Sequence, residues 1–120
     1  MAIQKFEDII AWQKAQDLAV EIYELFGNLK DFSFKDQITR ATVSISNNIA
    51  EGFERSSDAD FSRFLYISFA SCSEVRSMLY LAERLKYITI ERRDSLQERS
   101  IEISKIIYGL IKSLSNKPGK

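Results

Sequence analysis

Two carboxylates, Glu51 and Glu74, come nearest to a catalytic pattern in this chain. Carboxylates on two neighbouring helices can divide general acid and general base roles between them. A structural interpretation competes with this, because Glu51 and Arg55 stand four residues apart, a spacing at which helical side chains pair. Arg40 or Arg76 would neutralise the same carboxylates. We favour the structural interpretation, since ion-pair networks also perturb carboxylates.

The rest of the sequence lacks the residues that most enzyme chemistry needs. It contains no histidine, which removes the commonest general base, the Ser-His and Cys-His pairs and the Glu-x-x-His motif of di-iron bundles. The single Cys72 can form neither an intrachain disulfide nor a zinc site, and we expect it to be a buried, unreactive thiol. Glycines occur only at positions 27, 52, 109 and 119, so no glycine-rich phosphate loop exists. We therefore predict no enzyme activity, no cofactor and no metal.

The segment 37–56 mixes Ile and Ala with Thr, Ser and Asn on what reads as one helix. Polar side chains that are buried need hydrogen-bond partners. We therefore predict a buried or half-buried polar network that joins this helix to the next one. Its expected members are Arg40, Asn48, Glu51 and Glu74.

Four glycines and one proline are too few for the frequent turns of a strand-rich fold, so the prediction is all-helical. The first helix is expected over about 7–26, ending at Gly27. The second is expected over 33–54, with Ser33 and Asp36 as a capping box. The third follows the cap Ser57 and is about 29 residues long. The fourth follows the cap Thr89 and ends near 114.

Amphipathic helices joined by short connections pack most simply as an antiparallel up-down-up-down four-helix bundle. A three-helix array with the last helix docked elsewhere would need a longer link. The predicted domain is 1–114, elongated because its third helix would be roughly 43 Å long. Residues 115–120 are expected to be a disordered polar tail.

The third helix also indicates self-association. Its heptad seam consists of Phe61, Leu65, Ser68, Cys72, Val75, Leu79 and Ala82. Further apolar and aromatic residues flank this seam on both sides, among them Ile67, Tyr66 and Tyr80. This apolar arc is wider than one bundle core requires, and an extra apolar surface on a small protein usually marks an interface. We predict a homo-oligomer.

Charge is balanced overall, with 17 basic and 17 acidic residues, but it is unevenly distributed. Residues 1–31 hold three lysines against six acids, and residues 89–120 hold seven basic residues against four acids. The basic side chains of the last helix are candidate contacts for RNA or DNA. They are Arg92, Arg93, Arg99, Lys105 and Lys112. The alternative is a solvated face with contacts among Glu98, Glu102 and Lys105.

No signal peptide precedes the first predicted helix, and no run of about eighteen apolar residues could span a bilayer. One cysteine suits a reducing compartment. These observations lead us to expect a cytoplasmic protein without a membrane partner.

Three blocks resemble one bacterial family over nearly the whole chain. They are Phe6-x-Asp8-Ile9-x-x-Trp12-Gln13-x-Ala15, Gln37-Ile38-x-Arg40-Ala41-x-x-Ser44-Ile45-x-x-Asn48-Ile49-Ala50-Glu51-Gly52-x-x-Arg55 and Phe64-Leu65-x-x-x-x-Ala70-Ser71-x-x-Glu74. They resemble the four-helix-bundle proteins also called 23S ribosomal RNA intervening-sequence proteins. Thr39 stands where the family commonly has a second arginine.

The resemblance implies a four-helix bundle that assembles as a ring-like homopentamer. It also implies kinship with the accessory protein of diversity-generating retroelements, which works with nucleic acid and a reverse transcriptase. Two hypotheses of function follow. The first is a non-enzymatic assembly or adaptor protein. The second is an accessory protein that binds RNA, DNA or a nucleic-acid-handling protein. Near-neutral charge favours the first hypothesis and kinship favours the second.

Overall fold

The computed structural model describes residues 3–115, which form four α-helices and one short 3-10 turn. The turn covers Phe6–Asp8, and the helices are α1 (Ile10–Phe26), α2 (Phe32–Phe53), α3 (Asp58–Arg84) and α4 (Ile90–Ser115). No strand occurs among the described residues. The prediction of an all-α fold is confirmed.

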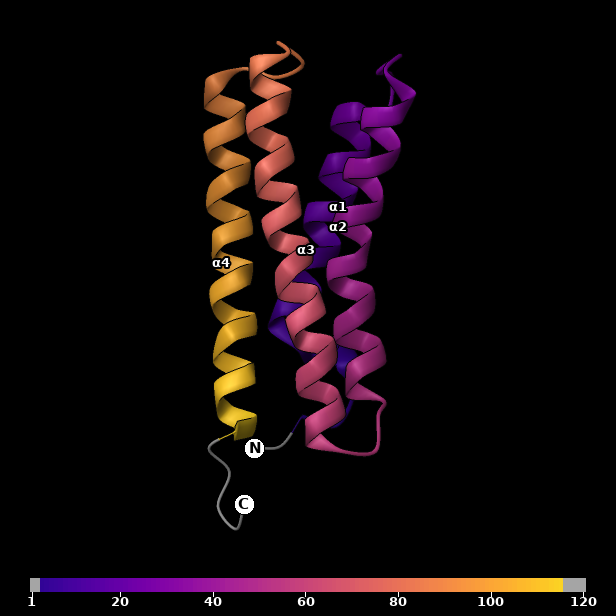
Figure 1. Ribbon diagram of the computed structural model, residues 1–120, viewed down its shortest axis with the longest axis vertical. Helices are drawn as coiled ribbons and strands as arrows, with labels where there is room; N and C mark the ends of the chain where they lie inside the picture. The colour runs from indigo at the N-terminus through magenta and orange to yellow at the C-terminus, as the bar shows by residue number, and fades with distance from the viewer. Residues whose placement is uncertain (1–2, 116–120) are drawn as a thin grey trace.

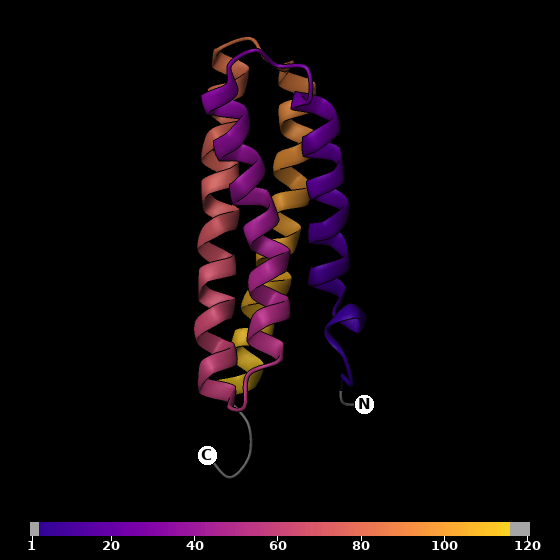
Figure 2. The same ribbon diagram turned by 90° about the vertical axis from the view of Figure 1, so that its right-hand side faces the viewer.

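The helices form an elongated antiparallel bundle, in which each helix reverses the direction of the one before it (Figures 1 and 2). Helix α1 packs against α2 and α4, and α3 also packs against α2 and α4. The diagonal pairs, α1 with α3 and α2 with α4, make no comparable contact. The bundle is therefore square in section, with extents of 51 × 20 × 20 Å, and α4 closes it rather than docking elsewhere.

Two of the predicted helix caps are present. The Ser57 hydroxyl accepts a hydrogen bond from the Asp60 amide at the start of α3, and the Thr89 hydroxyl accepts one from the Arg92 amide at the start of α4. Each bond satisfies an amide that has no partner within the helix. Helix α3 has 27 residues, slightly fewer than the predicted length.

The start of α2 differs from the prediction. Its N-cap is Asp31, whose carboxylate accepts from the Phe34 amide at 3.1 Å, while Ser33 already lies inside the helix. The same carboxylate accepts a hydrogen bond from the Tyr87 hydroxyl at 2.6 Å. These two bonds, that of Tyr87 first, lower the pKa of Asp31. Asp31 was overlooked because its second partner lies 56 residues away along the chain.

The start of α1 also differs. Residues Glu7 and Asp8 belong to the 3-10 turn, and Ile9 interrupts the helical path with an extended backbone. Side chains anchor the turn, because the ring of Phe6 packs edge-on against Trp12 with centroids 5.3 Å apart. Ser115 is the last residue of α4 rather than the first of a tail. The rest of the predicted tail, 116–120, lies outside the described residues.

The core follows the helical periodicity of the sequence. On α1, Ala11, Ala15, Leu18 and Ile22 recur at spacings of three and four residues and are fully buried. The α3 seam is buried from Leu65 to Ala82, and only Phe61 at its end is half-buried. The buried Ser68 hydroxyl of this core donates a hydrogen bond to the Ile45 carbonyl of α2 at 2.7 Å. Such a bond offsets the cost of burying a hydroxyl.

Candidate functional site

The residues of the predicted polar network lie on α2 and α3 but are not brought together within one chain. The Arg40 side chain is 78% exposed and pairs with Asp36 on its own helix at 2.9 Å. Glu51 is exposed and makes no side-chain hydrogen bond or ion pair with the described residues. Both residues lie on the outward side of α2, where their charges remain hydrated.

Other polar groups link α2 to α3 instead. The hydroxyls of Ser44 and Ser71 lie 2.9 Å apart, and the Asn48 amide donates to the Ser44 carbonyl and hydroxyl. Asn48 therefore supports the link from its own helix. The small hydroxyls of the polar block, rather than its charges, join the two helices.

The proposed neutralisation of the two carboxylates is not seen either. Glu74 accepts a hydrogen bond from the Gln37 amide at 3.4 Å, and neither Glu51 nor Glu74 forms an ion pair in residues 3–115. The Arg55 guanidinium instead lies 4.7 Å from the centre of the Phe64 ring. No hydrogen bond or ion pair in residues 3–115 connects Glu51 with Glu74, so the structure does not assemble them as an acid–base pair.

Three of the five candidate nucleic-acid contacts are held by carboxylates. Arg92 and Arg99 both pair with Glu21 of α1. Arg93 bonds Glu83 of α3 at 2.9 Å and Asp94 at 2.8 Å. The Asp94 and Glu83 carboxylates raise the pKa of Arg93, and the hydrogen bond that Arg93 donates to Asp94 contributes most. These three arginines therefore stabilise the contacts of α4 with its neighbours and present less free positive charge than the sequence suggests.

The two remaining candidates, Lys105 and Lys112, form no ion pair among the described residues. Lys112 is exposed, and its ammonium group lies 6.0 Å from the centre of the Tyr108 ring. Lys105 is exposed beside Glu98 and Glu102, which line the same shallow surface hollow. The carboxylates reduce the positive potential at Lys105, in line with the solvated-face alternative.

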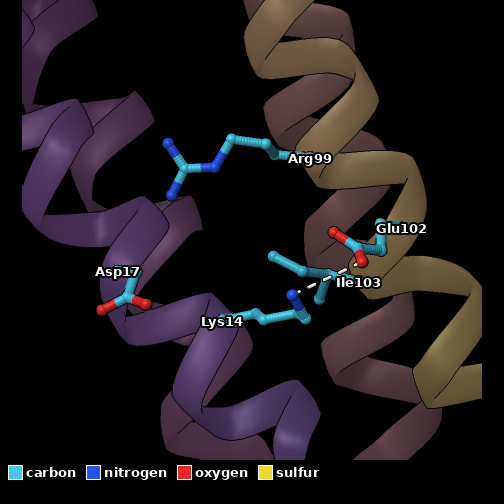
Figure 3. A pocket seen from close by; sticks show the side chains of 5 residues that line it. All are labelled: Lys14, Asp17, Arg99, Glu102 and Ile103. Carbon is cyan, nitrogen blue, oxygen red and sulfur yellow. Dashed lines mark ion pairs between the residues drawn. The ribbon is translucent and has the colours of Figure 1, made fainter.

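A small polar cavity lies between α1 and α4 (Figure 3). Its volume is about 80 Å³, and Lys14 and Asp17 line it from α1. Arg99, Glu102 and Ile103 line it from α4. Lys14 reaches across the seam to Glu102 at 3.4 Å, and Arg99 extends from α4 toward α1. Positive and negative groups balance, so the cavity is best explained as a hydrated seam between two helices.

Several large aromatic and aliphatic side chains are exposed on the surface of the bundle. On the side formed by α3 and α4, Tyr66, Tyr80 and Tyr108 are 53%, 48% and 47% exposed. We call this side the tyrosine face; it also includes Phe69, whose ring contacts that of Tyr108 at 6.0 Å, and Ile101. Helix α3 thus carries more apolar and aromatic side chains than the core covers, and Tyr66 and Tyr80 are among those that stay exposed.

A second set of exposed apolar side chains lies on the side formed by α1 and α2. It consists of Val20, Tyr23 and Phe32, and we call it the α1/α2 face. Tyr23 and Phe32 line a surface hollow together with Lys35, Asp36 and Thr39. The sequence analysis did not identify this face, because it sought an apolar excess only on the third helix. Val20, three residues before Tyr23, is the signal that could have shown it.

Groups for catalysis are not concentrated anywhere in residues 3–115. No cluster of three or more His, Cys, Asp or Glu that could hold a metal is present there. Cys72 is fully buried, and desolvation raises the pKa of its thiol to about 11. None of the described helices combines the length and apolar character needed to span a bilayer. The described residues therefore define a small four-helix bundle whose distinguishing surfaces are apolar faces.

Comparison with known proteins gives this bundle its family. The chain belongs to the 23S rRNA-intervening sequence protein family, whose sequence model it matches over residues 7–109. A solved structure from Bacteroides thetaiotaomicron, described as a protein of unknown function from the S23 ribosomal protein family, shares 34% identity with it and superposes with a TM-score of 0.80. The match covers 86% of this chain and 99% of that one. No curated protein matches the chain. The resemblance seen in the sequence is confirmed.

Proposed function

We propose that this protein is a non-enzymatic assembly or adaptor protein that works as a ring-like homo-oligomer. The observation that carries the proposal is the tyrosine face, where three tyrosines about half exposed stand on one side of the bundle. Exposed aromatic side chains concentrated in this way are typical of interaction surfaces, because tyrosine contributes a large contact area with little loss of conformational entropy.

The dimensions of the bundle fit this proposal. One side measures 51 by 20 Å, which corresponds to an area of about 1,000 Å². Stable interfaces bury about 800 Å² on each partner. One side of this bundle therefore provides enough area for a stable contact with another copy. The resemblance to the family indicates five copies as the number in the ring.

The test is the mass of the purified protein in solution, measured by light scattering over a range of concentrations. We expect five times the chain mass of 13.9 kDa. A mass of one chain that does not change with concentration would overturn the proposal. A closed assembly of another size would preserve the assembly role and reject the pentamer.

A nucleic-acid-binding accessory role is the second candidate. It is favoured by Lys105 and Lys112, which have no ion-pair partner among residues 3–115 and would be repeated around a ring. If they and the arginines of α4 bind phosphates, affinity should fall with salt at a log–log slope of about −0.9 per duplex phosphate neutralised. Replacing Lys105 and Lys112 with Glu should abolish binding without changing the helical signal. Absence of binding to RNA and DNA at low salt would leave the adaptor role alone.

A further inference from the structure

We infer that assembly is head-to-tail: the tyrosine face of one copy binds the α1/α2 face of the next, and Arg76 of the first copy pairs with Glu24 of the second. This inference rests on the proposed self-association and adds the two surfaces, their polarity and a pair of opposite charges. The occupant of the tyrosine face is thus a second copy of this chain.

The tyrosine face is built from two stripes that run along the α3/α4 seam. On α3 the residues at positions 69, 73, 76 and 80 recur at helical spacing, and on α4 those at 97, 101, 104 and 108 do the same. The stripes meet at both ends: Phe69 contacts Tyr108, and the Gln97 amide donates to the Arg76 carbonyl at 2.8 Å. The outer surface of this seam therefore presents aromatic rings around Arg76.

Arg76 itself lacks a counter-charge. Its side chain is half-buried, its Nε is buried without a hydrogen-bond partner, and it forms no ion pair within residues 3–115. The neighbouring Gln97 is 6% exposed, and its carbonyl oxygen is also buried without a partner. Buried donors that lack a partner are costly, and a guanidinium binds a carboxylate with a fixed geometry. An incoming carboxylate would meet the charge of Arg76.

Two other cations of this face are placed over aromatic rings. The Arg93 guanidinium lies 5.2 Å from the centre of the Tyr80 ring, and the Lys112 ammonium lies near Tyr108. Arg93 is neutralised by Glu83 and Asp94. Arg76 differs from them because its Nε is buried without a partner, which makes it the cation of this face with most to gain from an incoming carboxylate.

The α1/α2 face lies on the opposite side of the same molecule. It is not acidic as a whole, because Lys35 lies over its Phe32 ring and Asp36 is paired with Arg40, so the carboxylate for Arg76 is that of the neighbouring Glu24. Because α1 does not touch α3 and α2 does not touch α4, the α1/α2 and α3/α4 sides lie on opposite sides of the bundle. Glu24 is exposed next to Tyr23, one turn beyond Val20, and makes no bond with a described residue. It belongs to residues 1–31, in which six acids stand against three lysines.

Two complementary surfaces on opposite sides of one chain generate a head-to-tail contact, which closes into a ring when the rotation between copies allows it. A single surface that bound its own copy would give a dimer and leave the other surface uncovered. An acidic segment of a different protein would explain the tyrosine face alone. A second copy explains both faces, and this is why we assign it.

The decisive experiment uses two variants, each of which disables one face. The first, Arg76→Glu with Tyr80→Glu, disrupts the tyrosine face, and the second, Tyr23→Arg with Glu24→Arg, disrupts the α1/α2 face. Each alone should have the mass of one chain by light scattering, with an unchanged helical circular dichroism signal. Mixed in equal amounts they should form a complex of two chains, because only one pair of intact faces remains. Glu51→Lys is the control that should keep the wild-type mass, because Glu51 is an exposed residue of α2 that lines neither face and makes no bond with a described residue.

The charge pair is tested in one chain. Arg76→Glu alone and Glu24→Arg alone should each weaken assembly, and the two together should restore the wild-type mass. Failure of the double variant to recover would reject Glu24 as the counter-charge. Wild-type mass in both face variants would overturn the head-to-tail inference while leaving self-association intact. If the mixture of the two face variants forms oligomers larger than two chains, the head-to-tail inference is likewise overturned. A wild-type protein that is monomeric would overturn the proposed assembly and this inference together, leaving an acidic segment of another protein as the occupant.

Discussion

Gly52 on α2 is the position where a single added methyl group should have the clearest effect. It is buried against α3, and a Cβ built there would lie 2.6 Å from the Cβ of Phe64 and 3.0 Å from a ring carbon of Phe61. Carbon atoms make their best contact at about 3.5–4.0 Å. The Cβ of Phe64 is fixed to the α3 backbone and cannot swing aside, so the two helices would have to separate by about 1 Å.

Two opposing effects decide the outcome of Gly52→Ala. In a helix interior alanine is more favourable than glycine by about 1 kcal/mol. Overpacking a close-packed contact costs about 1–3 kcal/mol. Because the clash involves a Cβ held by the backbone, we expect the cost to lie near the upper end of that range. The variant should then be destabilised by about 1–2 kcal/mol, which lowers the melting temperature by roughly 4 °C or more.

Gly109 on α4 is the matched control, because a Cβ built there has no atom within 4 Å. Gly109→Ala should therefore raise the free energy of unfolding by up to about 1 kcal/mol. Urea denaturation followed by far-UV circular dichroism, at one chain concentration for all samples, measures both changes. If Gly52→Ala is as stable as Gly109→Ala, the contact between α2 and α3 can accommodate a methyl group, and the predicted clash with Phe64 is wrong.

Three further predictions concern buried or bonded side chains. Ser68→Ala should reduce the free energy of unfolding by about 1 kcal/mol, because the hydroxyl donates to the Ile45 carbonyl in the core; no change in the urea midpoint would contradict this. Cys72 should react slowly with a thiol reagent at pH 8 in the folded protein and quickly in urea, since burial raises its pKa to about 11; equal rates would show that the site opens readily. Asp31→Asn should lower the melting temperature at neutral pH, because the bond from Tyr87 lowers the pKa of Asp31 from 3.8 and so favours the folded state above that pH. The difference in melting temperature between Asp31→Asn and wild type should become smaller as the pH falls below about 4. A difference in melting temperature that does not depend on pH would refute the role of the Asp31 charge.

Local sequence was sufficient for the elements of the fold. The heptad spacing from Leu65 to Ala82 placed the buried side of α3, and Ser57 and Thr89 marked two helix starts. These features depend on residues three or four positions apart, so the sequence contains both partners. Asp31 shows the limit of local sequence. Its hydrogen bond with Tyr87 joins the α1–α2 connection to the α3–α4 connection, and these two residues are 56 positions apart in the sequence.

The candidate surfaces depended more on tertiary structure. The sequence indicated that α3 was too apolar for one core, but it could not tell which residues α2 and α4 would cover. Phe64 and Met78 became buried, whereas Tyr66 and Tyr80 remained exposed. Charges showed the same limit, because Arg92 and Arg99 counted as free positive charge until the fold placed both beside Glu21.

The sequence by itself therefore determined the all-helical class, the approximate extent of the helices and the buried seam of α3, because helical periodicity and capping are local properties, and its motifs indicated the family. Only the tertiary structure decided which polar groups pair and which apolar side chains stay outside. Those outcomes depend on the order in which four helices surround one core, and that order brings together residues that no sequence spacing relates. Arg76 is the clearest case, since its lack of a counter-charge becomes visible only when every neighbouring carboxylate has been placed.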